Sequence, residues 1–486
     1  ANPALIVLNF NSNQLTSLNV SNNTVLTDLR LIDNQLTSLD VSANPALTRL
    51  FCNNNQLSSL NVRNGNNTDI IIFRAINNPD LTCIYVDNVS YSTTNWTEID
   101  PASTFVENEA ECSALYTAIP DPNFEQALIE LGIDTNPTID GQVPTANISG
   151  VTILSVSSYN ISNLTGIEDF TALTRLFCNG NQLTVLNVNA NTQLEYLDCS
   201  ANLLTDLDVS LNIALISLNF AGNQLIVLDV SKNTQLDYLN CSANLLTDLD
   251  VSLNIALSEL NCNNNQLTGL NISENTALRS FSCDSNLLTD LDVSENTQLV
   301  FLNCSANLLT SLDVSNNNAL LTLTCQNNQL TSLNVSGTIS GGNALSFLRC
   351  EDNLLTSLNV FDNANLTQLI CKNNQLTGSL DLGNNFFLTE LKCQSNKIET
   401  INIRNGNNDN VTFFNALNNP DLYCMVVDDI DYSTTNWTNI DPAVTLVEDV
   451  ALCENLSIVD NDFELDVTIY PNPTDNYLFI EGNENP

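Results

Sequence analysis

The sequence has 486 residues, and 43% of them are hydrophobic, enough to fill a large core and to exclude a disordered chain. Its 12 Lys and Arg against 55 Asp and Glu give a net charge of −43; so acidic a surface repels nucleic acid and anionic lipid, and we expect neither nucleic-acid binding nor membrane insertion. Because it has no histidine, it lacks the commonest general base and most zinc sites, and we predict no enzyme, no catalytic residue and no metal ligand.

The first predicted element, residues 1–76, is built from short repeats that return more regularly in residues 171–402. The repeat has a 21-residue period, as from Cys178 to Cys199, and contains two apolar patterns, L-x-x-L-x-C-x-x-N-x-L and L-x-x-L-x-V-S-x-N. Residues two apart on a strand point the same way, so that Leu197 and Cys199 face inward while Asp198 faces water. One unit cannot bury its apolar face alone, whereas stacked units share a core. We therefore predict a solenoid with parallel strands.

Two ladders of asparagine accompany the repeats. Asn181 and Asn202 begin a ladder at the turn after the strand of the first pattern, and Asn191 and Asn212 begin a matching ladder in the second pattern. An Asn side chain bonds backbone groups of its own turn and the next, which satisfies amides that a tight bend leaves unpaired. We interpret both ladders as structural.

The first module ends in residues 77–116, a predicted C-terminal cap and linker. Residue 1 falls inside a repeat, so we expect residues 1–76 to be the C-terminal repeats of a longer module and the chain to be a fragment or a processed product. A second module then follows. Residues 117–170 are its predicted N-terminal cap, with a helix that begins near Pro122 and stops at Gly132. Its apolar stripe is expected to contain Phe124, Leu128 and Leu131.

The second module continues through residues 171–402 and ends in a cap at residues 403–456. This cap matches the first one almost residue for residue over residues 61–112 and 402–453. Each cap carries a pair of cysteines at the same spacing (112 − 83 = 29 and 453 − 424 = 29), and the cysteines are Cys83, Cys112, Cys424 and Cys453. We predict one disulfide in each cap and therefore an oxidising extracellular compartment. Two further buried thiols in each cap are the alternative.

The other cysteines all occupy the inward site of the first pattern. Other repeats place Leu31 or Phe220 there, so the position asks for apolar volume rather than for a thiolate. Side chains that point the same way also suit disulfide geometry badly. We expect these cysteines to be buried free thiols.

The repeats of residues 3–402 resemble the leucine-rich-repeat family, and their 21-residue spacing is most similar to its bacterial, internalin-like members. The resemblance implies a β-rich solenoid with parallel strands on the concave face, short extended or 3-10 segments on the convex face, and capping elements. Outward strand residues on the concave face then become the candidate ligand-binding residues, because aromatic and basic side chains are the usual anchors of interfaces. These candidates are Arg175, Tyr196, Tyr238, Phe301, Phe347, Arg349, Lys372 and Lys392. The same residues also suit ordinary strands on a solvated face.

Residues 457–486 form a small C-terminal β segment, in which two alternating strands flank a Pro-Asn-Pro turn. It resembles the start of the C-terminal sorting domain of the type IX secretion system of Bacteroidetes. The match rests on Tyr470, Pro471, Asn472, Pro473, Leu478 and Ile480. The resemblance implies the secretion machinery as a partner. A generic β-sandwich tail is the alternative.

Together these features predict a secreted or cell-surface protein that binds an extracellular protein or glycan in adhesion or recognition. A structural spacer with no ligand of its own is the alternative, and a chain that is mainly secretion cargo is a third. No cofactor is expected. The acidic surface either only keeps the protein soluble or also binds calcium weakly through ladders of side-chain oxygens.

Overall fold

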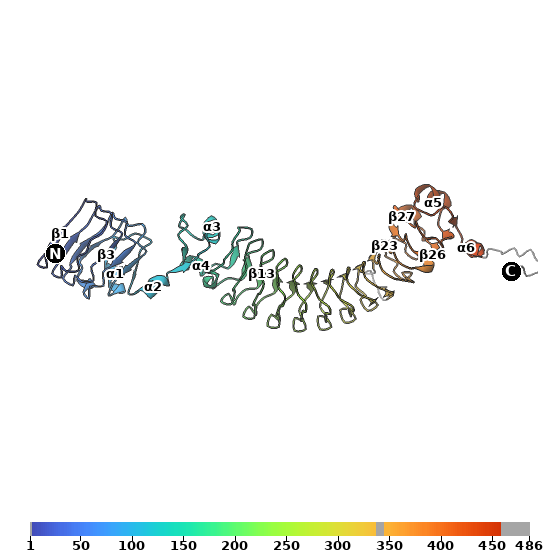
Figure 1. Ribbon diagram of the computed structural model, residues 1–486, viewed down its shortest axis with the longest axis horizontal. Helices are drawn as coiled ribbons and strands as arrows, with labels where there is room; N and C mark the ends of the chain where they lie inside the picture. The colour runs from blue at the N-terminus through green and yellow to red at the C-terminus, as the bar shows by residue number, and fades with distance from the viewer. Residues whose placement is uncertain (1, 337–344, 458–486) are drawn as a thin grey trace, which may run out of the picture. The chain divides into compact units, whose positions relative to one another are not determined.

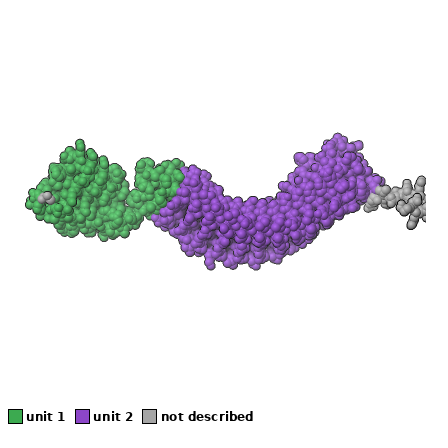
Figure 2. Space-filling view, in the orientation of Figure 1, with its two compact units in different colours: residues 1–151 green, residues 152–486 purple. Residues whose placement is uncertain are grey.

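The computed structural model describes residues 2–336 and 345–457. Its contacts divide the chain into two compact units, Ala1–Val151 and Thr152–Pro486, which Figure 2 colours separately. The module and cap boundaries expected from the sequence stay predictions.

Unit 1 contains two parallel sheets of four strands, with the orders β1-β2-β4-β6 and β3-β5-β7-β8 (Figure 1). The first sheet consists of β1 (Val7–Asn9), β2 (Asp28–Arg30), β4 (Arg49–Phe51) and β6 (Ile72–Arg74). The second consists of β3 (Ser38–Asp40), β5 (Ser59–Asn61), β7 (Cys83–Tyr85) and β8 (Thr104–Val106). The two apolar patterns of each repeat therefore supply the two sheets in turn.

Unit 2 is organised by one parallel sheet of 13 strands in chain order. Its strands are β11 (Ile153–Ser155), β12 (Arg175–Phe177), β13 (Tyr196–Asp198), β14 (Ser217–Asn219), β15 (Tyr238–Asn240), β16 (Glu259–Asn261), β17 (Ser280–Ser282), β18 (Phe301–Asn303), β20 (Thr322–Thr324), β22 (Phe347–Arg349), β23 (Gln368–Ile370), β25 (Glu390–Lys392) and β27 (Phe413–Asn415). Leu176 pairs with Leu197, and Leu197 pairs with Leu218, so each strand is paired with the equivalent strand of the next repeat. The predicted solenoid of 21-residue turns is confirmed.

The second pattern of unit 2 forms strands only in its later turns. These are β19 (Ser311–Asp313) with β21 (Ser332–Asn334), and a four-stranded sheet of β24 (Thr377–Asp381), β26 (Lys397–Asn402), β28 (Cys424–Val426) and β29 (Thr445–Val447). Among the described residues, 3-10 helices occur at η1 (Asn67–Asp69), η2 (Ile167–Asp169) and η3 (Asn408–Asn410). Among the described residues of unit 2, the side opposite the long sheet therefore has regular strands only in these later turns.

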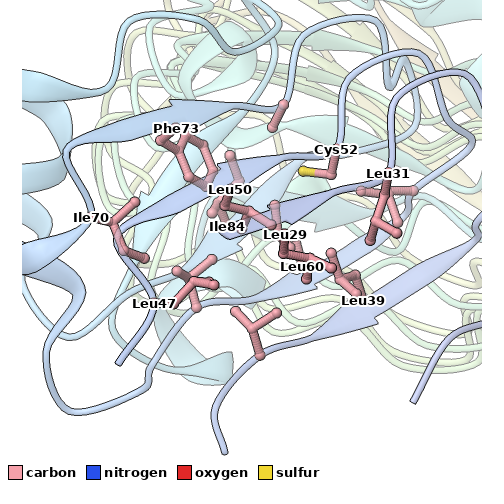
Figure 3. Close-up of a cluster of buried hydrophobic side chains, with 14 of the residues drawn as sticks. Leu29, Leu31, Leu39, Leu47, Leu50, Cys52, Leu60, Ile70, Phe73 and Ile84 are labelled. Carbon is pink, nitrogen blue, oxygen red and sulfur yellow. The ribbon is translucent and has the colours of Figure 1, made fainter. Parts of the chain in front are cut away.

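The core is a column of stacked leucine, valine and cysteine side chains. Figure 3 shows its part in unit 1, where Leu29, Leu50 and Cys52 lie together and have no solvent exposure. Burying one such leucine contributes about 2 kcal/mol. Cys52 is one of eleven free cysteines, and all eleven are buried. Leu31 and Phe220 fill the same site without exposure, so the site requires volume, as the sequence predicts.

The asparagine ladders connect neighbouring turns. In the first ladder, Nδ2 of Asn202 donates to the carbonyl oxygens of Cys178 and Cys199 at 3.1 and 3.0 Å, while its Oδ1 accepts from the amide of Leu183. In the second, Nδ2 of Asn212 donates to backbone oxygens of the preceding turn, that of Val188 among them, at 2.9 Å. Both ladders are structural, as predicted.

The residue before each first-ladder asparagine has a left-handed backbone, a feature that the sequence analysis did not predict. Ala201, Ala243 and Ala306 have φ values of 50°, 51° and 51°. Only glycine adopts this region without a steric cost. The hydrogen bonds of the following asparagine hold the turn in this conformation, which offsets the strain.

A helical segment precedes the long sheet in the sequence. It contains α3 (Pro122–Glu130), α4 (Thr145–Ile148) and an antiparallel pair of β9 (Tyr116–Ala118) and β10 (Gln142–Pro144). Asp121 caps α3 by accepting from the amides of Asn123 and Phe124. Leu131 was wrongly assigned to the apolar stripe: it follows the helix and is 44% exposed, and Ala127 is buried beside Leu128 instead.

The two C-terminal caps are built alike. Unit 1 has α1 (Val89–Asn95) and α2 (Glu109–Ser113), and unit 2 has α5 (Ile430–Asn436) and α6 (Val450–Ser457). Trp96 stacks on Phe73 with ring centroids 4.2 Å apart, and Trp437 stacks on Phe414 at 4.4 Å. Each indole nitrogen donates to a buried backbone oxygen. Large aromatic rings thus close the last turn of each core.

Each cap also contains the disulfide that the cysteine spacing predicts. Cys83 is bonded to Cys112 in unit 1, and Cys424 is bonded to Cys453 in unit 2. Both bonds attach the final cap helix to a strand of the second side. Such a bond stabilises chiefly by restricting the unfolded chain.

We predict that Asn317→Ala lowers the free energy of unfolding by about 2 to 4 kcal/mol, because it leaves two buried carbonyl groups without a donor. These are the carbonyls of Val293 and Asn296, to which Asn317 donates at 2.9 and 3.0 Å. Urea unfolding followed by circular dichroism measures the change. Asn316→Ala, at the exposed neighbouring position, is the matched control and should change stability little. Equal effects of the two substitutions would contradict the structural role.

We predict that the inward thiols react only when the protein unfolds. Burial raises the pKa of the Cys241 thiol to about 12, so the reactive thiolate is scarce at neutral pH. Iodoacetamide followed by intact mass should add no labels to the native protein, eleven to the unfolded protein without reductant, and fifteen after reduction. More than eleven labels before reduction would show that a cap disulfide is absent; fewer would show bonds inside the column.

Candidate functional site

The outward residues of the 13-stranded sheet form the candidate surface, which we call the strand face. In each three-residue strand the middle residue is buried, and the first and third residues point outward. Arg175, Tyr196, Tyr238, Phe301 and Phe347 occupy first positions. Arg349 and Lys392 occupy third positions, while Lys372 lies two residues beyond β23. The strand face is therefore a regular array on one continuous parallel sheet.

One group of candidates lies at the start of the sheet. The Arg175 guanidinium lies over the Tyr196 ring, 4.6 Å from its centroid. Tyr238 lies two strands further on, with Ser217 of β14 between the two tyrosines. Burial raises the pKa of the Tyr238 hydroxyl above its ordinary value, so it remains a hydrogen-bond donor to higher pH than an exposed tyrosine. This group offers aromatic area with polar ends.

A second group lies toward the end of the sheet. Phe347 and Arg349 share β22, and Lys372 and Lys392 follow in the next two turns. Arg349 donates two hydrogen bonds to Oε1 of Glu351, and Lys392 forms an ion pair with Glu390. Five strand steps separate β15 from β22, about 24 Å at the spacing of paired strands. Phe301 lies between the groups, so the eight candidates do not form one pocket.

A polar row that the sequence patterns do not predict lies beside the second group. The residue after the inward cysteine is Gln326, Glu351, Lys372 and Gln394 in four successive turns. Glu351 is 3% exposed, and its Oε2 has no hydrogen-bond partner within the described chain. Side-chain oxygens of Gln326 and Gln394 are buried without a partner there as well. A pattern search for aromatic and basic residues passes over such acceptors.

The aspartates of the second pattern lie outside the strand face. An open groove of about 440 Å³ is lined by Asp290, Asp292 and Asp313. Asp292 and Asp313 accept from the backbone amide two residues on, and hydrogen bonds from Ser294 and Ser315 lower the pKa of their carboxyl groups. These carboxylates shape the turns. Within the described parts of the chain, no three His, Cys, Asp or Glu residues are grouped to hold a metal ion.

The predicted sorting residues, from Tyr470 to Ile480, lie outside the described residues. In the part of the chain that the structure describes, no helix has the length and apolar character needed to cross a membrane. No protein-family model matches the sequence, and no curated protein matches it.

Solved structures supply the comparison. The functional domain of InlJ from Listeria monocytogenes, described as including a cysteine ladder, is 32% identical; the match covers 68% of this chain and 70% of that chain, with a TM-score of 0.54. The internalin InlF from Listeria monocytogenes strain 4b F2365 is 23% identical and has the same fold, with 67% and 95% covered and a TM-score of 0.53. The chain therefore belongs to the leucine-rich-repeat family and is similar to its internalin-like members.

Proposed function

We propose that the chain is a secreted or cell-surface recognition protein that binds an extracellular protein or glycan through the strand face of unit 2, which the family resemblance assigns to the concave side. One observation carries the proposal: a chain of net charge −43 places aromatic and basic side chains at outward sites of its 13-stranded sheet. Such side chains supply most of the binding energy in interfaces. A sheet that is fixed before binding loses little entropy on binding.

Location outside the cytoplasm is part of the proposal. Two cap disulfides suit an oxidising compartment, where such bonds persist. The resemblance of residues 461–482 to a type IX sorting domain supports export by that machinery, which would be the partner of the tail. Weak calcium binding by the acidic second pattern is also tested by the binding experiment below.

A structural spacer is the second candidate. Several charges of the strand face are already paired inside the protein, as in Arg349 with Glu351 and Lys392 with Glu390. A face that satisfies its own charges needs no ligand.

We predict that Tyr196→Ala, Tyr238→Ala, Arg349→Ala and Lys372→Ala each weaken ligand binding about tenfold or more, because each removes an anchor from the strand face. An array of extracellular proteins and glycans, probed with the whole chain with and without calcium, first identifies the ligand. Titration then gives the affinity of each variant, and thermal unfolding verifies its fold. The matched control is Lys232→Ala, an equal loss of charge outside the strand face.

The control should keep the wild-type affinity. If no array component binds, or if all four variants bind as the wild type does, the spacer is the correct account. If the wild type binds the ligand with calcium and loses binding when calcium is withdrawn, the chain binds a functional calcium ion.

A further inference from the structure

Unit 1 has an outward face of its own, and its chemistry differs from that of unit 2. Its paired strands β2, β4 and β6 align Asp28 with Arg49 and Ile72, and Arg30 with Phe51 and Arg74. We call these six residues the arginine grid. It contains three of the 12 basic residues of the whole chain. This concentration is larger than that on any other three neighbouring strands of the described sheets.

The guanidinium groups of the grid are held in place by their neighbours. Arg30 and Arg74 come from the two strands that flank β4, and their Cζ atoms lie 5.3 and 5.8 Å from the centroid of the Phe51 ring. Arg30 also donates from Nε and Nη2 to the two oxygens of Asp28, both at 2.9 Å. A guanidinium fixed in this way loses little further freedom when it binds an anion.

The charges of the grid do not cancel. Asp28 forms ion pairs with both Arg30, at 2.9 Å, and Arg49, at 3.7 Å. Arg74 forms an ion pair with Glu98 at 2.9 Å. Three guanidiniums against two carboxylates leave 3 − 2 = +1 in a chain of net charge −43. The three arginine side chains are 38%, 45% and 47% exposed. Each guanidinium has five N–H donors, so several donors stay free for a ligand.

The equivalent strands of unit 2 show that the fold does not require the residues of the arginine grid at these outward positions. Strands β23, β25 and β27 precede the second cap as β2, β4 and β6 precede the first. The inward residues of the two sets are the same in order, Leu, Leu and Phe. The outward residues of the second set are Gln368, Ile370, Glu390, Lys392, Phe413 and Asn415, and all six differ from the grid. Packing therefore fixes the inward residues, and the outward ones are free to serve binding.

We propose that the arginine grid is a binding site for an acidic polysaccharide whose carboxylate or sulfate groups bind Arg30, Arg49 and Arg74. Guanidinium groups bind such anions with strong, directional hydrogen bonds. Two strand spacings separate Arg30 from Arg74, about 10 Å, which is comparable with one disaccharide of an extended chain that carries an acid group on alternate sugars. Phe51 and Ile72 offer partly exposed apolar area to a sugar ring. Poly-glutamate, an acidic peptide, has no ring that could pack on that area.

The test uses the whole chain and chondroitin sulfate as the probe, with dextran as a neutral polysaccharide and poly-glutamate as an acidic peptide. The wild type should bind chondroitin sulfate, and binding should weaken with added salt. The double substitution Arg30→Gln with Arg74→Gln should lower the affinity about tenfold or more, because two fixed donors are lost. If the double variant fails to fold, Arg49→Gln replaces it in the test. This substitution disturbs fewer contacts and should weaken binding severalfold.

Arg63→Gln is the matched control, since Arg63 lies over the Tyr85 ring at 5.0 Å outside the grid. It should keep the wild-type affinity. Absence of chondroitin sulfate binding, equal loss in the Arg63→Gln variant, or equally tight binding of poly-glutamate would each overturn the proposal. Comparison with Tyr196→Ala in unit 2 separates the two proposals, because a loss of chondroitin sulfate binding in that variant and not in the double variant would place the site on the strand face and overturn this proposal.

Discussion

The side-chain amide of a buried asparagine, bonded to backbone oxygens of the preceding turn, is the interaction on which this solenoid depends. Each turn of the repeat bends the backbone twice inside the stack, where water cannot reach the carbonyl groups. Asn202 and Asn212 supply the missing donors and bond each turn to the one before it. An unpaired buried carbonyl costs about 1 to 3 kcal/mol, so repeated bends without asparagine would exceed the stability of an ordinary domain.

This constraint also divides the residues of each turn between structure and function. Leucine, cysteine and asparagine are fixed by the column and its bends, and the caps are fixed by the need to close its end. Outward strand positions carry no such requirement. The contrast between Arg30 and Ile370, which occupy equivalent outward sites in the two units, shows how far these positions vary on one frame. These are the positions through which we propose that the chain binds its ligands.

The sequence predicts the repeating parts of the fold well, because each inward or bonded position recurs many times. Leu197, Cys199 and Asn202 are recognisable from their spacing alone. Features that arise once, or that depend on backbone strain, leave no such recurring pattern and are not predicted from the sequence. The left-handed turn at Ala201 has no signal in its residue type, since alanine does not favour that region. Leu131 looked like part of a helical stripe, but the helix ends one residue earlier.

The candidate site was harder to predict for a physical reason. Aromatic and basic residues are visible in a sequence, and Arg175 with Tyr196 proved to be neighbours. Whether charges are already paired, as in Arg349 with Glu351, depends on three-dimensional neighbours that no pattern states. The buried acceptor of Glu351 was missed because a carboxylate in an acidic chain carries no signal.

The central claim, that equal turns share one column through their asparagines, is tested most directly by removing one turn. Deleting residues 231–251 joins Val230 to Ser252, which is equivalent to Ser231, and should leave a folded protein with a single cooperative urea transition. Deleting residues 231–241 removes half a turn and should abolish that transition. If each of the two deletion variants lost the fold, the account would be contradicted.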